Sequence, residues 1–141
     1  MRLRRIEAVR FGRLTDASLG DLGDGLTVVE GPNEAGKSSF TALVRHVLYG
    51  FPTAREKERQ YRSPAGKRQG RLMFQDGDAR WVVERTEGPH GGPVEVRGLD
   101  GVAHPALLEE VCAGVSPLAF KVVFGFGLDE MAHIENLRGS D

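Results

Sequence analysis

One short segment of the sequence carries the residue types and spacing that bind phosphate. Residues 31–38 read Gly-Pro-Asn-Glu-Ala-Gly-Lys-Ser and match the pattern G-x-x-x-x-G-K-[ST]. Gly31 and Gly36 permit backbone conformations that other residues avoid, and they let the main chain approach a ligand closely. The N–H groups of such a loop point inward at the positive end of the following helix, which favours an anion. The segment therefore predicts a site for the phosphates of a nucleoside triphosphate.

Two side chains of this segment have defined chemistry. Lys37 is expected to reach the β- and γ-phosphates, and the Ser38 hydroxyl is expected to ligate Mg²⁺. The side chains of Asn33 and Glu34 are expected to face away from the phosphates, because Glu34 would otherwise repel them. Lys37 is accordingly the candidate catalytic cation and Ser38 the candidate metal ligand.

The elements beside the segment suit a phosphate loop. The β-branched run at residues 26–30 predicts a buried strand that leads into the loop. Behind the loop, apolar residues recur at helical spacing, which predicts an amphipathic helix. Gly50 and then Pro52 are expected to end it. The apolar face consists of Phe40, Leu43, Val44, Val47 and Leu48.

The rest of the chain predicts an antiparallel sheet added to this core. Residues 3–11 and 16–19 are expected to be paired strands, and Asp76-Gly77-Asp78 is a good hairpin turn between strands at 70–75 and 79–85. Further elements are expected as a strand at 93–96 and helices at 105–112, 116–123 and 128–137. The expected fold class is α/β, a P-loop NTPase fold with an added antiparallel β-sheet, in a single domain over residues 1–141.

A complete P-loop ATPase also needs an acidic site at the end of an apolar strand. Asp129 and Glu130 follow the apolar residues 124–128 and suggest such a site. However, two glycines in this stretch make a poor buried strand, and few residues follow Glu130. One reading remains a self-contained small P-loop NTPase or kinase that uses Asp129 and Glu130. Another is a nucleotide-binding switch without catalysis.

The residues around the loop resemble a known family. Gly-Pro-Asn-Glu-Ala-Gly-Lys-Ser-Ser, with the helix that ends Leu-Tyr-Gly-Phe-Pro at residues 48–52, resembles the ABC-type ATPase heads of the SMC, RecF and SbcC group. Within that group it is similar to the YhaN-like bacterial AAA ATPases. Residues 3–7 and 11–13 resemble the first strand of those heads, and residues 120–130 resemble the end of their N-terminal lobe.

This resemblance implies ATP as the nucleotide and a head that is split in sequence. The N-terminal lobe would be followed by a long coiled coil and a C-terminal half with the signature motif and the general base. ATP hydrolysis would then require the C-terminal half of the same head and a second head in an ATP-dependent dimer, acting in DNA repair or chromosome maintenance. The nucleotide loop carried over by position comprises Gly31, Pro32, Asn33, Glu34, Ala35, Gly36, Lys37, Ser38 and Ser39.

Two further residues acquire candidate roles from the resemblance. Arg13, just after the first strand, is a candidate for contacting nucleotide or a partner, and a solvated arginine is the alternative. Related heads place a glutamine that senses Mg²⁺ and the attacking water near residues 127–130. This chain has no glutamine there, so Glu130 or Asp129 is the candidate replacement. The alternative for Glu130 is an exposed acid that favours a helix dipole.

Residues 54–71, which we call the basic segment, contain seven Arg or Lys and two Glu. Residues 54–69 are expected to form an exposed loop. The cations at 55–71 suggest non-specific contacts with DNA phosphates, and a solvated surface is the alternative. A nuclease subunit is a further partner that the resemblance implies. The seven cations are Arg55, Lys57, Arg59, Arg62, Lys67, Arg68 and Arg71.

Composition bounds the remaining possibilities. The chain has 141 residues, 40% hydrophobic residues and a net charge of −1, which indicate a globular domain without a general preference for polyanions. The single cysteine excludes an internal disulfide and suits a reducing compartment. Since no long apolar run or secretory signal occurs, we expect a cytoplasmic protein without membrane partners. The four scattered histidines do not predict a zinc site.

Overall fold

The computed structural model describes residues 2–25, 27, 36–112 and 114–116. Five strands and two α-helices lie in these ranges. The buried strand expected at 26–30 falls, except for residue 27, outside the described residues, as do the helices expected after residue 116. In chain order the elements are β1 (Arg2–Phe11), β2 (Leu14–Leu19), α1 (Lys37–Tyr49), β3 (Gln69–Asp76), β4 (Ala79–Thr86), a 3-10 turn at Pro89–Gly91, β5 (Val94–Gly98) and α2 (Leu107–Cys112).

The five strands form one antiparallel sheet in the order β2-β1-β3-β4-β5. The strands predicted at 3–11, 16–19, 70–75, 79–85 and 93–96 are confirmed, and β2 begins two residues earlier than expected. β3 and β4 are joined by the predicted tight turn, where Gly77 has a φ of 58°. That conformation favours glycine because it lacks a Cβ atom. The long central pair β1–β3 joins the N-terminal hairpin to this second hairpin.

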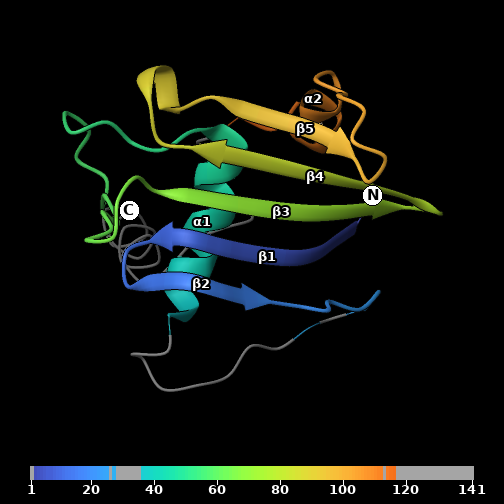
Figure 1. The fold of residues 1–141 in the computed structure, drawn as a ribbon, viewed down its shortest axis with the longest axis horizontal. Coiled ribbons are helices and arrows are strands. Elements are labelled where there is room, and N and C mark those ends of the chain that lie inside the picture. Colours follow the sequence, from blue (N-terminus) through green and yellow to red (C-terminus); the bar gives the residue numbers. More distant parts are fainter. Residues whose placement is uncertain (1, 26, 28–35, 113, 117–141) are drawn as a thin grey trace, which may run out of the picture.

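Helix α1 lies across one face of the sheet, with its first turn behind β2 and its last turn behind β4 (Figure 1). Its predicted apolar face packs on β1, β3 and β4. At the centre, Gly70 of β3 leaves room for the helix, since a Cβ atom there would lie 2.6 Å from Leu43 Cδ1. The shared core consists of Ile6, Ala8, Phe11, Ala42, Leu43, Val47, Leu48, Phe51, Leu72, Phe74, Val83 and Val96.

The last turn of α1 is held by a buried arginine of β4. The Arg85 guanidinium donates to the carbonyl oxygens of Val47 at 2.8 Å and Leu48 at 3.3 Å, and to Gly92 O at 2.7 Å. The carbonyl oxygens of Val47 and Leu48, in the last turn of α1, have no N–H donor within the helix. The Arg85 cation supplies donors to both and interacts favourably with the helix dipole. Burial lowers the pKa of Arg85, yet arginine remains charged at neutral pH. The contact fixes the C-terminal end of α1 on the sheet.

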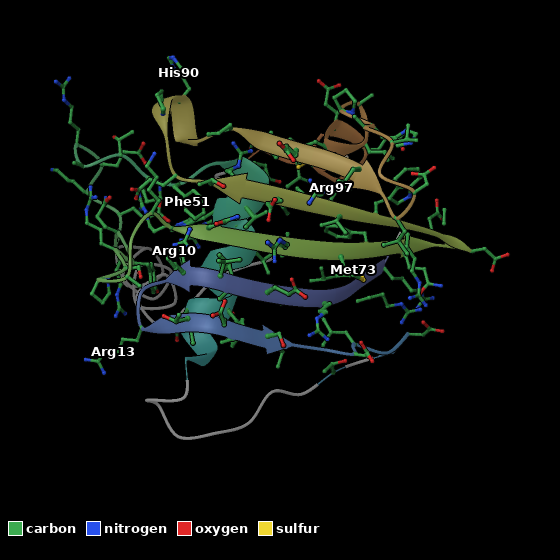
Figure 2. All side chains as sticks on the ribbon, viewed as in Figure 1. Arg10, Arg13, Phe51, Met73, His90 and Arg97 are labelled. Atoms are coloured by element: carbon green, nitrogen blue, oxygen red, sulfur yellow. The ribbon has the colours of Figure 1, made fainter. Side chains whose placement is uncertain are left out.

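The other face of the sheet carries charged side chains in alternation. Met73 and Arg97 lie on this face, while α1 lies behind it (Figure 2). Arg71 pairs with Glu84 on β4 and with Glu7 on β1, and Arg97 pairs with Glu84 at 3.5 Å. Cross-strand pairs of opposite charge of this kind stabilise a solvated sheet face modestly. The complete set, which we call the Arg–Glu ladder, comprises Arg5, Glu7, Arg71, Glu84, Arg97 and Glu95.

Candidate phosphate-binding site

The candidate site lies at the N-terminal end of α1. Gly36 is the N-cap residue, with φ 86° and ψ 17°, a left-handed conformation that suits glycine. Its carbonyl accepts the N–H of Phe40 at 3.1 Å. Gly36 supplies no side-chain cap, and the first turn holds no acidic residue. The first N–H groups of a helix lack acceptors within it, so this end is open to an external anion.

The sequence placed Lys37 and Ser38 directly after Gly36, and in the structure they open α1 as expected. Ser38 is exposed at the first turn and Ser39 is half-buried. An exposed serine hydroxyl at this position is available to a hydrated cation beside a bound phosphate. Five predicted members of the loop lie outside the described residues, namely Gly31, Pro32, Asn33, Glu34 and Ala35.

Arg13 lies in the turn between β1 and β2, and the side chain extends away from the sheet (Figure 2). The residue is exposed. Its neighbour Leu14 contacts the loop end, because a Cβ atom on Gly36 would lie 2.9 Å from Leu14 Cδ2. The β1–β2 turn thus lies beside the open end of α1, and Arg13 is one residue from that contact. The other candidates, Asp129 and Glu130, lie outside the described residues.

The basic segment differs from the expectation at two of its cations, of which Arg68 lies within the expected exposed loop. Arg68 is 2% exposed. Its Nε pairs with Glu87, and its terminal nitrogens donate to Gln60 O at 2.7 Å and Pro52 O at 2.9 Å. The prediction of exposure was wrong for this residue, because a guanidinium with five donors can be buried where carbonyl and carboxylate acceptors converge. Arg68 holds the two ends of the segment together and is not available to DNA.

Arg71 also departs from the expectation, because it lies inside β3 as a member of the Arg–Glu ladder. Its neighbouring carboxylates Glu84 and Glu7 raise the pKa of the guanidinium against the effect of burial. A cation paired with two carboxylates offers little net attraction to a polyanion. The cations of the segment that remain exposed are Arg55, Lys57, Arg59, Arg62 and Lys67.

A second anchor fastens the basic segment to α1. Glu58 pairs with Arg45, and its Oε1 lies 3.1 Å from Nε2 of the buried His46. The hydrogen bond from His46, with Arg45 nearby, lowers the pKa of Glu58 to about 2. Burial lowers the pKa of His46. The imidazole is therefore neutral at pH 7, and since an ionised carboxylate only accepts, Nε2 carries the proton.

A third anchor joins the basic segment to the β1–β2 turn. The N–H of Gly12 donates to the carbonyl of Tyr61 at 2.7 Å. The Tyr61 ring stacks on Phe11, with centroids 4.8 Å apart and planes 13° from parallel. The guanidinium carbon of Arg59 lies 4.6 Å from the centroid of the Tyr61 ring. This contact was not predictable from the sequence, where the only signal was a tyrosine within an otherwise polar stretch.

Comparison with known proteins identifies the family of this chain. The model of a family described as an AAA domain matches residues 1–134, nearly the whole chain. The chain belongs to this AAA domain family. A chromosome partition protein Smc from Rhodopirellula baltica is 30% identical over 96 residues, which are 60% of this chain. The alignment spans only 8% of that protein's length.

Both matches are consistent with the N-terminal part of an SMC-group ATPase, as the sequence motifs predicted. The family match, the antiparallel five-stranded sheet and α1 are consistent with an α/β P-loop fold. AAA and SMC-type ATPases generally use ATP and Mg²⁺.

In the part of the chain that the structure describes, no three His, Cys, Asp or Glu side chains group as a metal site. Within the same part, no helix has the length and apolar character to cross a membrane.

Proposed function

We propose that this AAA domain is the N-terminal lobe of an ABC-type ATPase head that binds ATP with Mg²⁺. Residues 31–39 hold the nucleotide, Lys37 contacts the β- and γ-phosphates, and Ser38 ligates the metal ion. Efficient hydrolysis requires a C-terminal half with the signature motif, from the same head and from a second head. In this proposal, ATP holds two heads together and hydrolysis releases them.

The observation that carries this proposal is the conformation of Gly36. The last glycine of the sequence motif occupies the left-handed region directly before a 13-residue helix whose first turn has no acidic residue. Gly36, Lys37 and Ser38 therefore lie where the helix dipole and the first N–H groups favour an anion. The family match supports an adenine nucleotide, which no described residue selects by itself.

The proposed cellular role is chromosome maintenance or DNA repair. A relative named for chromosome partition supports it. The exposed cations of the basic segment support contact with DNA phosphates, because they are grouped on one anchored segment. A nuclease subunit remains a further proposed partner.

The test of nucleotide binding is calorimetric titration of the 141-residue chain with ATP and Mg²⁺. Lys37→Ala removes the loop cation and is expected to weaken ATP binding at least about tenfold, as loss of a charge-assisted contact to phosphate does. Lys67→Ala removes an exposed lysine of the basic segment and serves as the control with unchanged affinity. Equal affinity of the Lys37→Ala variant and the parent would refute the central proposal.

The same samples also test the requirement for a second half. The chain is expected to bind ATP without releasing phosphate at an ordinary enzymatic rate, of order 1–100 s⁻¹. Turnover at such a rate that depends on Glu130 would favour the self-contained NTPase instead.

A further inference from the structure

The β1–β2 turn lies between two contacts with distant parts of the chain. On one side, Leu14 meets Gly36 at the end of the phosphate loop. On the other side, Gly12 meets Tyr61 of the basic segment, and a Cβ atom on Gly12 would lie 3.4 Å from Tyr61 Cδ1. Arg13 is the residue between these two contacts.

The position of Arg13 depends on the turn rather than on its own side chain. Arg13 is exposed, and among the described residues it has no hydrogen-bond or ion-pair partner. The long side chain of an exposed arginine samples many rotamers, so its reach depends on where the backbone holds it. Gly12 has a φ of 57°, a conformation that glycine adopts readily, and its N–H donates to a carbonyl outside the turn.

Tyr61 supplies that external support. Its carbonyl accepts the Gly12 N–H at 2.7 Å, and its ring is stacked on the fully buried Phe11. The ring of the buried His46 on α1 lies edge-on to Tyr61, with centroids 6.0 Å apart. These contacts tie the turn to β1 and to α1 together.

The backbone of Tyr61 is itself strained, since its φ is 51°. A bulky residue in the left-handed region is disfavoured and persists only where its surroundings determine it strongly. The stacking on Phe11 and the hydrogen bond from Gly12 are the surroundings that do so here. Strain held in this way is a feature of positioned sites more than of free loops.

We infer that Tyr61 is a positioning residue for Arg13 at the nucleotide site. The Tyr61 carbonyl and ring hold the β1–β2 turn against the end of the phosphate loop, so that the Arg13 guanidinium reaches the bound phosphates. This inference rests on the proposed nucleotide binding and assigns a role to a residue that touches no ligand. Arg13 is the contact, and Tyr61 acts through it.

A double-mutant cycle tests the inference on the 141-residue chain. ATP affinity is measured by calorimetry for the parent, Arg13→Ala, Tyr61→Ala and the double variant. Loss of an arginine–phosphate contact is expected to weaken ATP binding about tenfold. Tyr61→Ala alone is expected to weaken it about threefold to fivefold, because a misplaced donor loses part of its contribution. The double variant is expected to equal Arg13→Ala, since Tyr61 acts only through that side chain.

Two controls separate positioning from general stability. Tyr61→Phe keeps the ring and the carbonyl and is expected to retain parental affinity. Trp81 is a half-buried residue of β4, away from the candidate site, and its ring lies edge-on to that of His104. Trp81→Ala is expected to lower the melting temperature without changing ATP affinity. Hydrogen exchange of the Gly12 amide, followed by NMR, is expected to accelerate in Tyr61→Ala.

The outcomes distinguish a failure of the positioning role of Tyr61 from a failure of the proposed nucleotide binding. If Tyr61→Ala and Arg13→Ala weaken ATP binding multiplicatively, or if Tyr61→Ala retains full affinity while the Gly12 amide exchanges faster, the positioning role is wrong. If Tyr61→Ala does not fold, Tyr61→Leu, which keeps apolar bulk but not the planar stack, takes its place in the cycle. Failure of Lys37→Ala to weaken ATP binding would instead overturn the proposed function itself.

Discussion

Glu58 shows how a single carboxylate couples stability to pH in this chain. In the folded protein its pKa is about 2, against an ordinary value of 4.5, because His46 donates to it and Arg45 lies nearby. A carboxylate with a lowered folded pKa stabilises the protein above its ordinary pKa, and this contribution disappears as the pH falls through the folded value. Burial lowers the pKa of His46 from 6.5, so protonation of this imidazole also opposes folding as the pH falls below 6.5.

We therefore predict an acid-sensitive fold whose sensitivity resides in the Glu58–His46 pair. The free energy of unfolding, measured in urea at a series of pH values, is expected to fall from pH 6.5 and more steeply between pH 4.5 and 2. Glu58→Gln removes the titrating group and is expected to lose about 2 kcal/mol at pH 7 and to flatten the lower part of the profile. Glu56→Gln, at a neighbouring exposed position, is the matched control. A Glu58→Gln profile as steep as the parental one below pH 4.5 would contradict the assignment.

At the scale of elements, the sequence predicted the frame but not its buried polar contacts. Helix α1 was predictable because Gly36 and Gly50 bound a run of apolar residues at helical spacing. The β3–β4 hairpin was predictable because Asp76-Gly77-Asp78 separates two alternating runs. Both signals are local, which is the reason that they survive in a single sequence.

The burial of Arg68, Arg85 and His46 was not predictable in the same way. Each is polar, and each is buried only because partners distant in sequence converge on it: main-chain carbonyls on Arg68 and Arg85, and Glu58 on His46. The same holds for the contact between Tyr61 and Gly12. Residues of these types are more often exposed than buried, and only the tertiary fold supplies the partners that allow their burial. For the phosphate site, the motif gave the residues and the structure gave the neighbouring turn.

The capping of α1 by Arg85 gives a prediction at this scale. Arg85→Leu leaves three carbonyl acceptors without their donor in a buried place, and is expected to destabilise the fold by about 2–4 kcal/mol. Urea unfolding at pH 7 measures this change. Arg80→Leu alters an exposed arginine of the same strand and is expected to change stability by less than about 0.5 kcal/mol. An equal effect of both substitutions would show that the cap contributes nothing particular.

At the scale of the whole molecule, the described arginines and lysines of the open sheet face differ from those of the basic segment in how far carboxylates compensate their charge. On the open sheet face, the Arg–Glu ladder pairs each arginine with carboxylates, so this face presents mixed charge. On the basic segment, five cations remain exposed, against one exposed acid, Glu56, since Glu58 is paired with Arg45. Attraction of a polyanion depends on uncompensated charge, so the basic segment is the surface where DNA contact is expected.

We predict that reversing two of these charges weakens DNA binding in the complete head. Arg62→Glu with Lys67→Glu is expected to reduce affinity for a short duplex and to lower the slope of log affinity against log salt by about two. Fluorescence anisotropy over a salt series gives both quantities. Arg80→Glu with Arg97→Glu makes the same change of net charge on β4 and β5 and is the matched control. Equal losses for the two double variants would assign the effect to overall charge rather than to the basic segment.

The Arg85 cap has a mechanical consequence for the opposite end of α1. Because the C-terminal end of α1 is tied to β4 and to Gly92, the helix can tilt about that end more easily than it can slide. A 13-residue helix is about 20 Å long, so a tilt of about 5° displaces its first turn by nearly 2 Å while the pivot stays in place. The candidate phosphate-binding end of α1 is thus the end farthest from the pivot, and if the nucleotide binding that we propose tilts the helix, the displacement is expected to be largest next to the turn that carries Arg13.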